Sequence, residues 1–110
     1  MKPNHLAVAA ALADPTREAI VQLLVEREHA VGEIAERLPV ARPTVSKHLR
    51  LLESAGLVQF RSEGTRNVYA IRPEALAELR DELDRMWSRA LARYALVARN
   101  TDPAGNKKRT

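Results

Sequence analysis

The sequence contains no cysteine, and this absence removes several classes of protein at once. Without thiols there is no disulfide framework, no zinc site built on cysteine and no thiol chemistry. Long apolar runs are also missing, since the stretch from Leu6 to Ala13 falls well short of the ~18 to 20 residues that a bilayer span requires. The N-terminus shows no basic segment followed by an apolar run and a cleavage site. We therefore expect a cytoplasmic protein without a membrane anchor.

What the sequence does contain is the composition of one small globular domain. Its 110 residues are 45% hydrophobic and 29% charged, which is typical of folded chains. A chain of this length buries roughly two-thirds of its unfolded surface, so it needs no covalent cross-link to be stable. We expect residues 1–99 to form a single domain. Residues 100–110 have no apolar periodicity, and we expect them to be a flexible basic tail.

Positive charge is concentrated in the middle of the chain. Residues 42–72 carry six basic and two acidic side chains, and this excess equals the net charge of +4 of the whole chain. Such a concentration attracts polyanions, among which nucleic acid is the expected partner of a small cytoplasmic domain. A solvated surface with surplus lysine and arginine would explain the charge alone equally well.

Helical periodicity extends from the N-terminus to about residue 56. Asp14 and Pro15 supply an N-cap oxygen and a first-turn proline for the second helical segment. His29 and Ala30 are interpreted as a short joint before the third segment, which Pro39 ends. The four segments are residues 6–13, 15–28, 31–38 and 42–54.

The fourth helical segment has an inner and an outer face. Val45, Leu49 and Leu52 are its inner positions. With the preceding helix and the turn at residues 39–41, it makes a helix-turn-helix. The outer face is polar and basic, with no acid before Glu53, whereas an ordinary surface helix mixes both signs. The outward residues that suit DNA contact are Arg42, Pro43, Thr44, Ser46, Lys47, His48 and Arg50.

Beyond Gly56, which is placed to end the helix in a left-handed conformation, the period changes from helical to alternating. Two strand-like runs, residues 57–61 and 66–71, flank a loop at residues 62–65. In that loop Gly64 can take the positive φ that a hairpin needs. A hairpin directly after a helix-turn-helix is a wing. Its residues suited to phosphate or minor-groove contact are Arg61, Thr65, Arg66 and Asn67.

The last segment predicts one long helix that opens at Pro73. Its apolar residues keep helical spacing over a stretch that the short preceding elements cannot cover. A second copy of the same helix would cover this stripe, so we expect a homodimer that pairs through the first and last helices. The alternative is a helix that folds back on its own domain. The expected interface residues are Leu6, Leu12, Leu79, Leu83, Met86, Trp87, Ala90, Leu91 and Tyr94.

Four motifs follow one another along these elements: ALADPTR at 11–17, VGEIAERL at 31–38, RPTVSKHLRLLESAGLV at 42–58 and RSEGTRNVY at 61–69. In this order they resemble the ArsR-type winged-helix repressors, over roughly residues 5–95. The resemblance implies a mainly α winged helix-turn-helix with about five helices and a two-stranded wing. It also implies a homodimer that represses transcription, often of its own operon, with a recognition helix in the major groove of an imperfect palindrome. It assigns base contacts to Arg42, Thr44, Ser46 and Lys47, and backbone contacts to His48, Arg50, Arg61 and Arg66.

Two features depart from the family pattern. Ala41 stands where a Ser or Thr cap is common, which removes a side-chain cap worth ~1 kcal/mol. Many relatives sense metals through Cys on the recognition helix or His and Asp on the last helix, but this chain has no Cys and no His beyond His48. The one arrangement left open pairs His5 with a carboxylate from a second copy. We therefore expect no metal and no cofactor. The sequence does not identify a small-molecule effector, so that partner stays open.

These observations predict a sequence-specific DNA-binding regulator of transcription. The alternative is a winged-helix adaptor that binds other proteins, since one fold serves many functions. An adaptor would carry apolar or mixed-charge residues on the outer face of residues 42–50, where this chain is polar and basic. We expect no enzymatic activity, because no GxSxG, P-loop or GxGxxG motif is present and His48 has no evident nucleophile or orienting partner.

Overall fold

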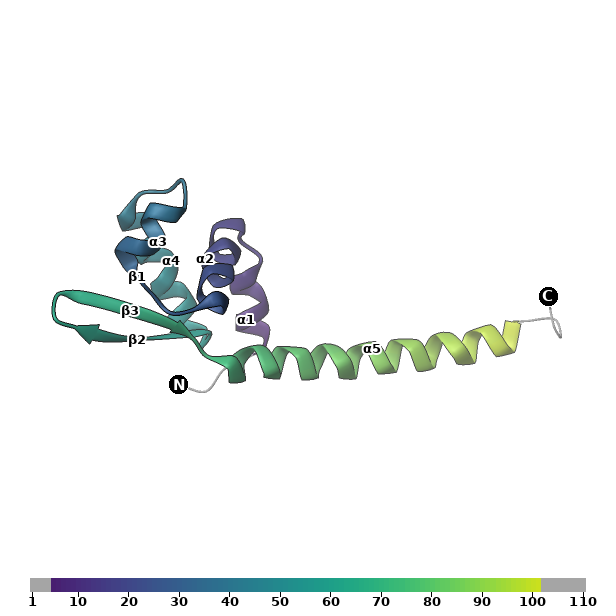
Figure 1. The fold of residues 1–110 in the computed structure, drawn as a ribbon. Coiled ribbons are helices and arrows are strands. Elements are labelled where there is room, and N and C mark those ends of the chain that lie inside the picture. The colour runs from purple at the N-terminus through teal and green to yellow at the C-terminus, as the bar shows by residue number, and fades with distance from the viewer. Residues whose placement is uncertain (1–4, 102–110) are drawn as a thin grey trace. The chain divides into compact units, whose positions relative to one another are not determined.

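The computed structural model describes residues 5–101. They fall into two compact units, one ending at Leu79 and one beginning at Arg80. The prediction of a mainly α winged helix-turn-helix with five helices is confirmed (Figure 1). The elements in chain order are α1 (His5–Leu12), α2 (Pro15–Glu26), β1 (His29–Ala30), α3 (Val31–Arg37), α4 (Arg42–Ser54), β2 (Val58–Glu63), β3 (Arg66–Ile71) and α5 (Pro73–Thr101).

Local sequence signals set where α2 and α4 begin. Asp14 caps α2 in an extended conformation, and its carboxylate accepts a hydrogen bond from the Arg17 backbone N–H at 3.0 Å. This hydrogen bond lowers the pKa of Asp14 below its ordinary value. Ala41 precedes α4 and makes no side-chain cap, as its lack of a polar group requires. The first turn of α4 is instead preset by a proline at its start, Pro43.

The end of α4 is a Schellman motif. Gly56 has a φ of 83°, and its N–H donates to the Glu53 carbonyl at 2.9 Å. The next N–H, that of Leu57, reaches back to the Leu52 carbonyl at 3.0 Å, and both leucine side chains are fully buried. The predicted left-handed conformation of Gly56 is therefore confirmed, and it sets the point at which the chain leaves α4 for β2.

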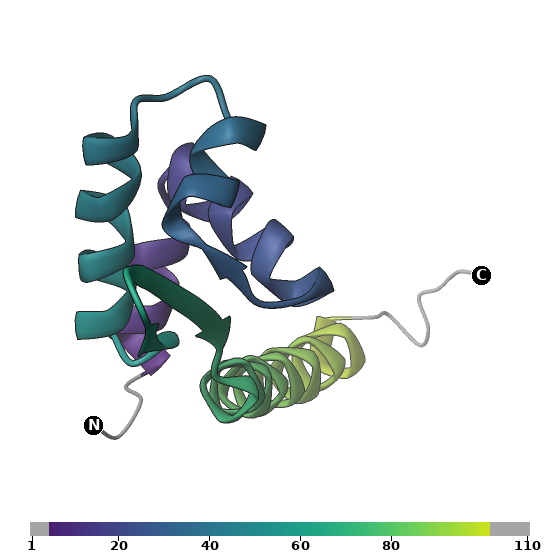
Figure 2. The same ribbon diagram turned by 60° about the vertical axis from the view of Figure 1, so that its left-hand side comes forward.

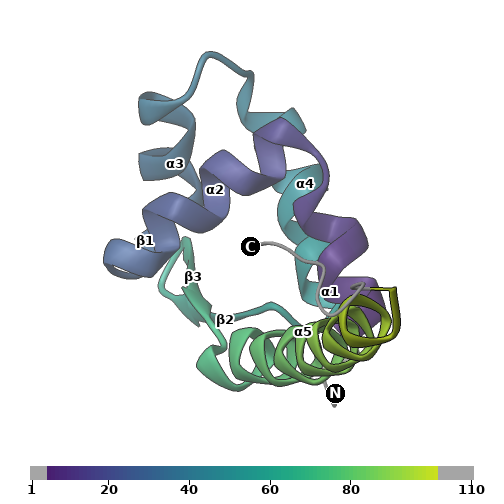
Figure 3. The ribbon, with the colours of Figure 1, turned by 90° about the vertical axis from the view of Figure 1, so that its right-hand side faces the viewer.

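One hydrophobic core holds the first unit together. Val45, Leu49 and Leu52 of α4 face it with no exposed surface, as predicted. Figure 2 and Figure 3 show the turn that joins α3 to α4, and these two helices pack against each other, while α2 also contacts α4. The outer face of α4 is thereby turned to solvent. The other core residues with no exposed surface are Val8, Ile20, Ile34, Leu57 and Ala75.

The sheet has three strands, one more than the sequence predicted. His29 and Ala30 are not a simple joint: they form β1, which pairs antiparallel with β3 in the register His29 with Tyr69 and Ala30 with Val68. Two residues are too few to show an alternating pattern, and the pairing exists only because β3 is folded beside them. The strand order β1-β3-β2 ties the base of the wing to the junction between α2 and α3.

The wing has a tighter tip than expected. Ser62 and Glu63 belong to β2, and Glu63 stands opposite Arg66 of β3. The loop is therefore two residues long instead of four. Gly64, with a φ of 62°, supplies the predicted positive φ at this turn.

The helix α5 belongs to both units. In the first unit Ala75 is buried, and Leu76 and Leu79 pack against the core. In the second unit the large apolar side chains are exposed, among them Trp87 at 68% and Tyr94 at 72%. No helix within residues 5–101 combines the length and the apolar character that a membrane crossing demands. The expected tail lies outside the described residues from position 102 onward.

We predict opposite effects of alanine at two glycines. Gly32 lies in α3, and a Cβ there would meet the Arg42 guanidinium at 3.6 Å, an ordinary contact distance. Because alanine favours helix by ~0.5–1 kcal/mol, Gly32→Ala should raise stability by up to that amount. Gly64→Ala should lower it by roughly 1–2 kcal/mol, because an L side chain disfavours a φ of 62°. Urea unfolding of the wild type and both variants measures these effects. A Gly64→Ala midpoint equal to that of the wild type would contradict the positive φ at this turn.

Candidate nucleic-acid interface

The outer face of α4 carries the predicted DNA-contacting side chains into solvent. Arg42, Pro43, Thr44, Lys47 and Arg50 are exposed, and Ser46 and His48 are half-buried. Within residues 5–101, none of the three basic residues Arg42, Lys47 and Arg50 forms an ion pair with a carboxylate. Their positive charge is therefore available to a polyanion. Contact of these residues with DNA stays a prediction.

Arg61 on β2 is held between two carboxylates. Its Nη1 donates to Glu28 at 2.9 Å and its Nη2 to the other oxygen of the same carboxylate. Its Nε donates to Glu63 at 2.7 Å, which is possible because residues two apart on a strand share a face. The hydrogen bond from Arg61 lowers the pKa of Glu28 below its ordinary value, and the bond to Glu28 raises the pKa of Arg61.

Arg66 on β3 has a looser partner. Its Nη2 lies 3.3 Å from Oε1 of Glu33, and the Arg27 guanidinium lies 3.8 Å from Oε2. The same Oε1 accepts the Ala30 backbone N–H at 2.8 Å, which is one half of a capping box at the start of α3. This backbone hydrogen bond is the main reason that the pKa of Glu33 is lowered, and the charges of Arg27 and Arg66 add to it.

We call these six residues the wing clasp. They comprise three cations and three anions, namely Arg27, Arg61, Arg66, Glu28, Glu33 and Glu63. The charge count along the sequence missed this balance, because Glu28 and Glu33 each lie 33 residues before the arginine that they contact. Although residues 42–72 carry an excess of positive charge, the part of that excess in the wing is paired. The unpaired charge of the interface lies on α4.

The other wing residues predicted to contact DNA are exposed. Thr65 lies in the two-residue loop, and Asn67 follows Arg66 on β3. The Ser62 hydroxyl donates to the side-chain amide oxygen Oδ1 of Asn67 at 3.2 Å across the hairpin. The structure therefore brings Arg61, Thr65, Arg66 and Asn67 together on one hairpin, as the sequence predicted.

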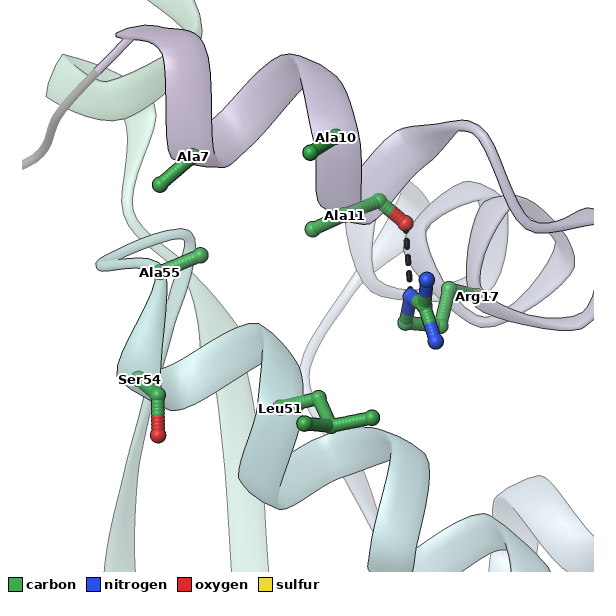
Figure 4. A pocket seen from close by; sticks show the side chains of 7 residues that line it. All are labelled: Ala7, Ala10, Ala11, Arg17, Leu51, Ser54 and Ala55. Atoms are coloured by element: carbon green, nitrogen blue, oxygen red, sulfur yellow. Dashed lines mark hydrogen bonds between the residues drawn. The ribbon is translucent and has the colours of Figure 1, made fainter.

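His48 does have an orienting partner, which the sequence analysis missed. Nη1 of Arg17, on α2, lies 3.4 Å from Nδ1 of His48. The Arg17 Nε donates to the Ala11 carbonyl at 2.7 Å, a hydrogen bond that is drawn in Figure 4. Because a guanidinium only donates, Nδ1 is the acceptor in this contact. The available signal was the ALADPTR motif, which contains both Ala11 and Arg17. Arg17 thus links the end of α1 to His48 on α4.

A shallow groove lies between α1 and α4. Its volume is about 340 Å³, and most of its lining is alanine, with the Arg17 guanidinium at one end (Figure 4). Its lining residues are Ala7, Ala10, Ala11, Arg17, Leu51, Ser54 and Ala55. In the described part of the chain, no three His, Asp or Glu side chains gather into a group that could hold a metal ion.

Comparison with known proteins identifies the family of this chain. A family model described as a helix-turn-helix domain matches residues 12–59. The HTH-type transcriptional regulator Rv2034 of Mycobacterium tuberculosis is 56% identical over 85 residues, which cover 77% of this chain and 79% of that protein. The ArsR-like transcriptional regulator from Rhodococcus sp. RHA1 superposes with a TM-score of 0.82 at 29% identity, covering 90% of this chain and 93% of that one. This chain belongs to the ArsR family.

A second solved structure, of a possible transcriptional regulator for arsenical resistance, has a TM-score of 0.67 at 38% identity, covering 78% of this chain and 93% of that one. Membership in the ArsR family makes this chain a helix-turn-helix regulator of transcription that binds DNA. The family is not enzymatic, which confirms that part of the sequence analysis.

We predict that the carboxyl group of Glu28 titrates below the ordinary value of 4.5. Since its folded pKa is lowered, the stabilisation by Arg61 is present above that value and is lost as the pH falls through the folded pKa. Arg61→Gln should return the Glu28 pKa toward its ordinary value. Carboxyl-carbon NMR titrations of the two proteins measure this shift, and identical curves would show that the ion pair does not form in solution.

Proposed function

We propose that this ArsR-family chain is a homodimeric repressor that binds an imperfect palindrome in the cytoplasm and represses its own operon among its targets. One observation carries the proposal: the face of α4 opposite the core is exposed, polar and basic, and its cations Arg42, Lys47 and Arg50 have no ion pair within the described chain. An exposed helix of this kind fits the major groove of B-DNA.

Within α4 the roles divide by position. Arg42 and Lys47 can donate to guanine O6 and N7, and the small side chains of Thr44 and Ser46 allow the helix to approach the base edges closely. His48 and Arg50 contact the phosphate backbone. Nδ1 of His48 faces Arg17, which leaves Nε2 for this contact. Phosphate or minor-groove contacts by the wing come from Arg61, Thr65, Arg66 and Asn67.

The proposed dimer rests on an apolar stripe along α5. In the second unit the side chains of Leu83, Met86, Trp87 and Leu91 are each at least half exposed. Left in water they would form an apolar patch larger than monomeric proteins usually tolerate. On α1, Leu6 is 70% exposed. A second copy that covers both surfaces would hold two α4 helices about one DNA turn apart, ~34–36 Å.

The other expected interface residues differ in exposure. Ala90 and Tyr94 are exposed and continue the stripe of α5. Leu12 and Leu79 are half-buried and pack against the core of the first unit. They can therefore give only part of their surface to a second copy. Membership in a DNA-binding family leaves the adaptor function without a supporting observation.

We predict that Arg42→Ala or Lys47→Ala weakens binding to the operator by about 1–3 kcal/mol and relaxes the preference for one base pair. Arg66→Ala should weaken binding to all sequences alike, because a phosphate contact carries no sequence information. Fluorescence anisotropy with the DNA upstream of the gene and a scrambled duplex, over a salt series, measures both effects. Operator binding at wild-type affinity by the α4 variants would refute these assignments.

We predict that Trp87→Glu yields monomers, because it places a charge in the middle of the apolar stripe. Leu96→Glu is the matched control. Leu96 is also exposed, at 55%, but lies on the opposite side of α5. Sedimentation velocity should give a monomer for the first variant and a dimer for the second. A dimer in both cases would remove this stripe from the interface.

A further inference from the structure

We propose that Glu28 and Glu63 compete with DNA phosphate for Arg61, so that contact between the wing and DNA is an exchange of anions. In the free protein the wing clasp keeps Arg61 paired, which weakens binding to DNA of any sequence. This inference rests on the proposed function, in which the wing reaches the phosphate backbone. In this proposal Glu28 and Glu63 set the affinity of the protein for DNA of any sequence.

The competition follows because the carboxylates already occupy every nitrogen of the Arg61 guanidinium. All three nitrogens of Arg61 are engaged: Nε by Glu63, Nη1 by Glu28, and Nη2 by both carboxylates. A phosphate binds arginine through the same pair of parallel N–H groups that now holds Glu28. Phosphate therefore cannot dock on Arg61 in this way without displacing the Glu28 carboxylate.

The backbone around Glu28 holds the competing carboxylate in place. Glu28 directly precedes β1, which is paired with β3 through His29 and Ala30. His29 is 1% exposed, and its Nδ1 hydrogen-bonds the Arg27 carbonyl at 2.8 Å. Arg27 in turn donates to the Glu28 carbonyl at 3.0 Å. The carboxylate is thus presented from an ordered segment, across the middle strand from β2.

The clasp is weak enough to open when DNA is held beside it. The side chains of Arg61, Glu28 and Glu63 are 50%, 46% and 45% exposed, and ion pairs between groups this exposed contribute little to stability. A DNA backbone presents about one negative charge per 1.7 Å of helix axis. Once α4 lies in the major groove, this charge is held next to the wing and can replace the carboxylates. Without that docking the exchange gains little.

The two wing arginines should therefore behave differently. Arg66 has one contact with Glu33, at 3.3 Å, and the Glu33 oxygen is shared with the Ala30 N–H. Arg61 has four contacts with two carboxylates. Arg66 is freer to bind phosphate, and Arg61 gains most when its partner is neutralised.

The test measures binding of the full chain to a scrambled duplex by fluorescence anisotropy at low and moderate salt. Glu28→Gln should tighten binding about three- to fivefold at low salt, a gain that converts to the energy of one exposed ion pair. The gain should shrink as salt screens the charges. Glu63→Gln should act in the same direction. Glu26→Gln is the matched control, since it removes the same charge from an exposed residue on α2 whose carboxylate is not among the partners of Arg61.

A double-mutant cycle shows whether the effect passes through Arg61. In an Arg61→Gln background, Glu28→Gln should leave affinity unchanged. The proposal is overturned if Glu28→Gln weakens binding, if it acts no more strongly than Glu26→Gln, or if its gain survives the loss of Arg61. Urea midpoints near that of the wild type confirm that the variants are folded.

Failure of the clasp and failure of the proposed function give different results. If the wild type binds the duplex and Lys47→Ala weakens operator binding, while Glu28→Gln has no effect, only the competition is wrong. If neither the wild type nor Glu28→Gln binds any duplex, the proposed function itself is wrong and the competition falls with it.

Discussion

The burial of one stripe of α4 is the constraint on which the interface depends. Val45, Leu49 and Leu52 have no exposed surface, and fully burying such side chains contributes roughly 1.5–3 kcal/mol each. A helix that turns these positions inward must turn the positions between them outward. The exposure of Arg42 and Lys47 is thus a geometric result of core packing. The Schellman motif at Gly56 then directs the chain into the wing.

Two kinds of positive charge meet at this interface, and the fold separates them. The cations of α4 have no carboxylate partner within the described chain, whereas those of the wing are paired in the clasp. If the basic residues of α4 and of the wing were all unpaired, this surface would attract any polyanion with equal strength. In the proposed function, the unpaired charge on α4 and the paired charge on the hairpin would instead favour binding in which α4 engages first.

Two contacts between elements hold the residues of the interface in place. Arg17 joins the α1 carbonyl of Ala11 to His48 of α4, and β1 joins the base of the wing to the start of α3. Both contacts connect the proposed DNA-binding surface to elements that make no proposed DNA contact themselves. In the proposed dimer α1 also faces the second copy, so Arg17 would connect the subunit interface with the helix that reads DNA.

Patterns within a few residues were enough to predict most of the fold. The helix bounds of α4, the Asp14 cap, the inner stripe and the positive φ of Gly56 and Gly64 all follow from backbone preferences and periodicity that act locally. The strand β1, the pairing of Glu28 with Arg61 and the contact of Arg17 with His48 did not follow. These pairs lie 31 or more residues apart. Only the register of the sheet and the packing of the helices decide which distant side chains meet.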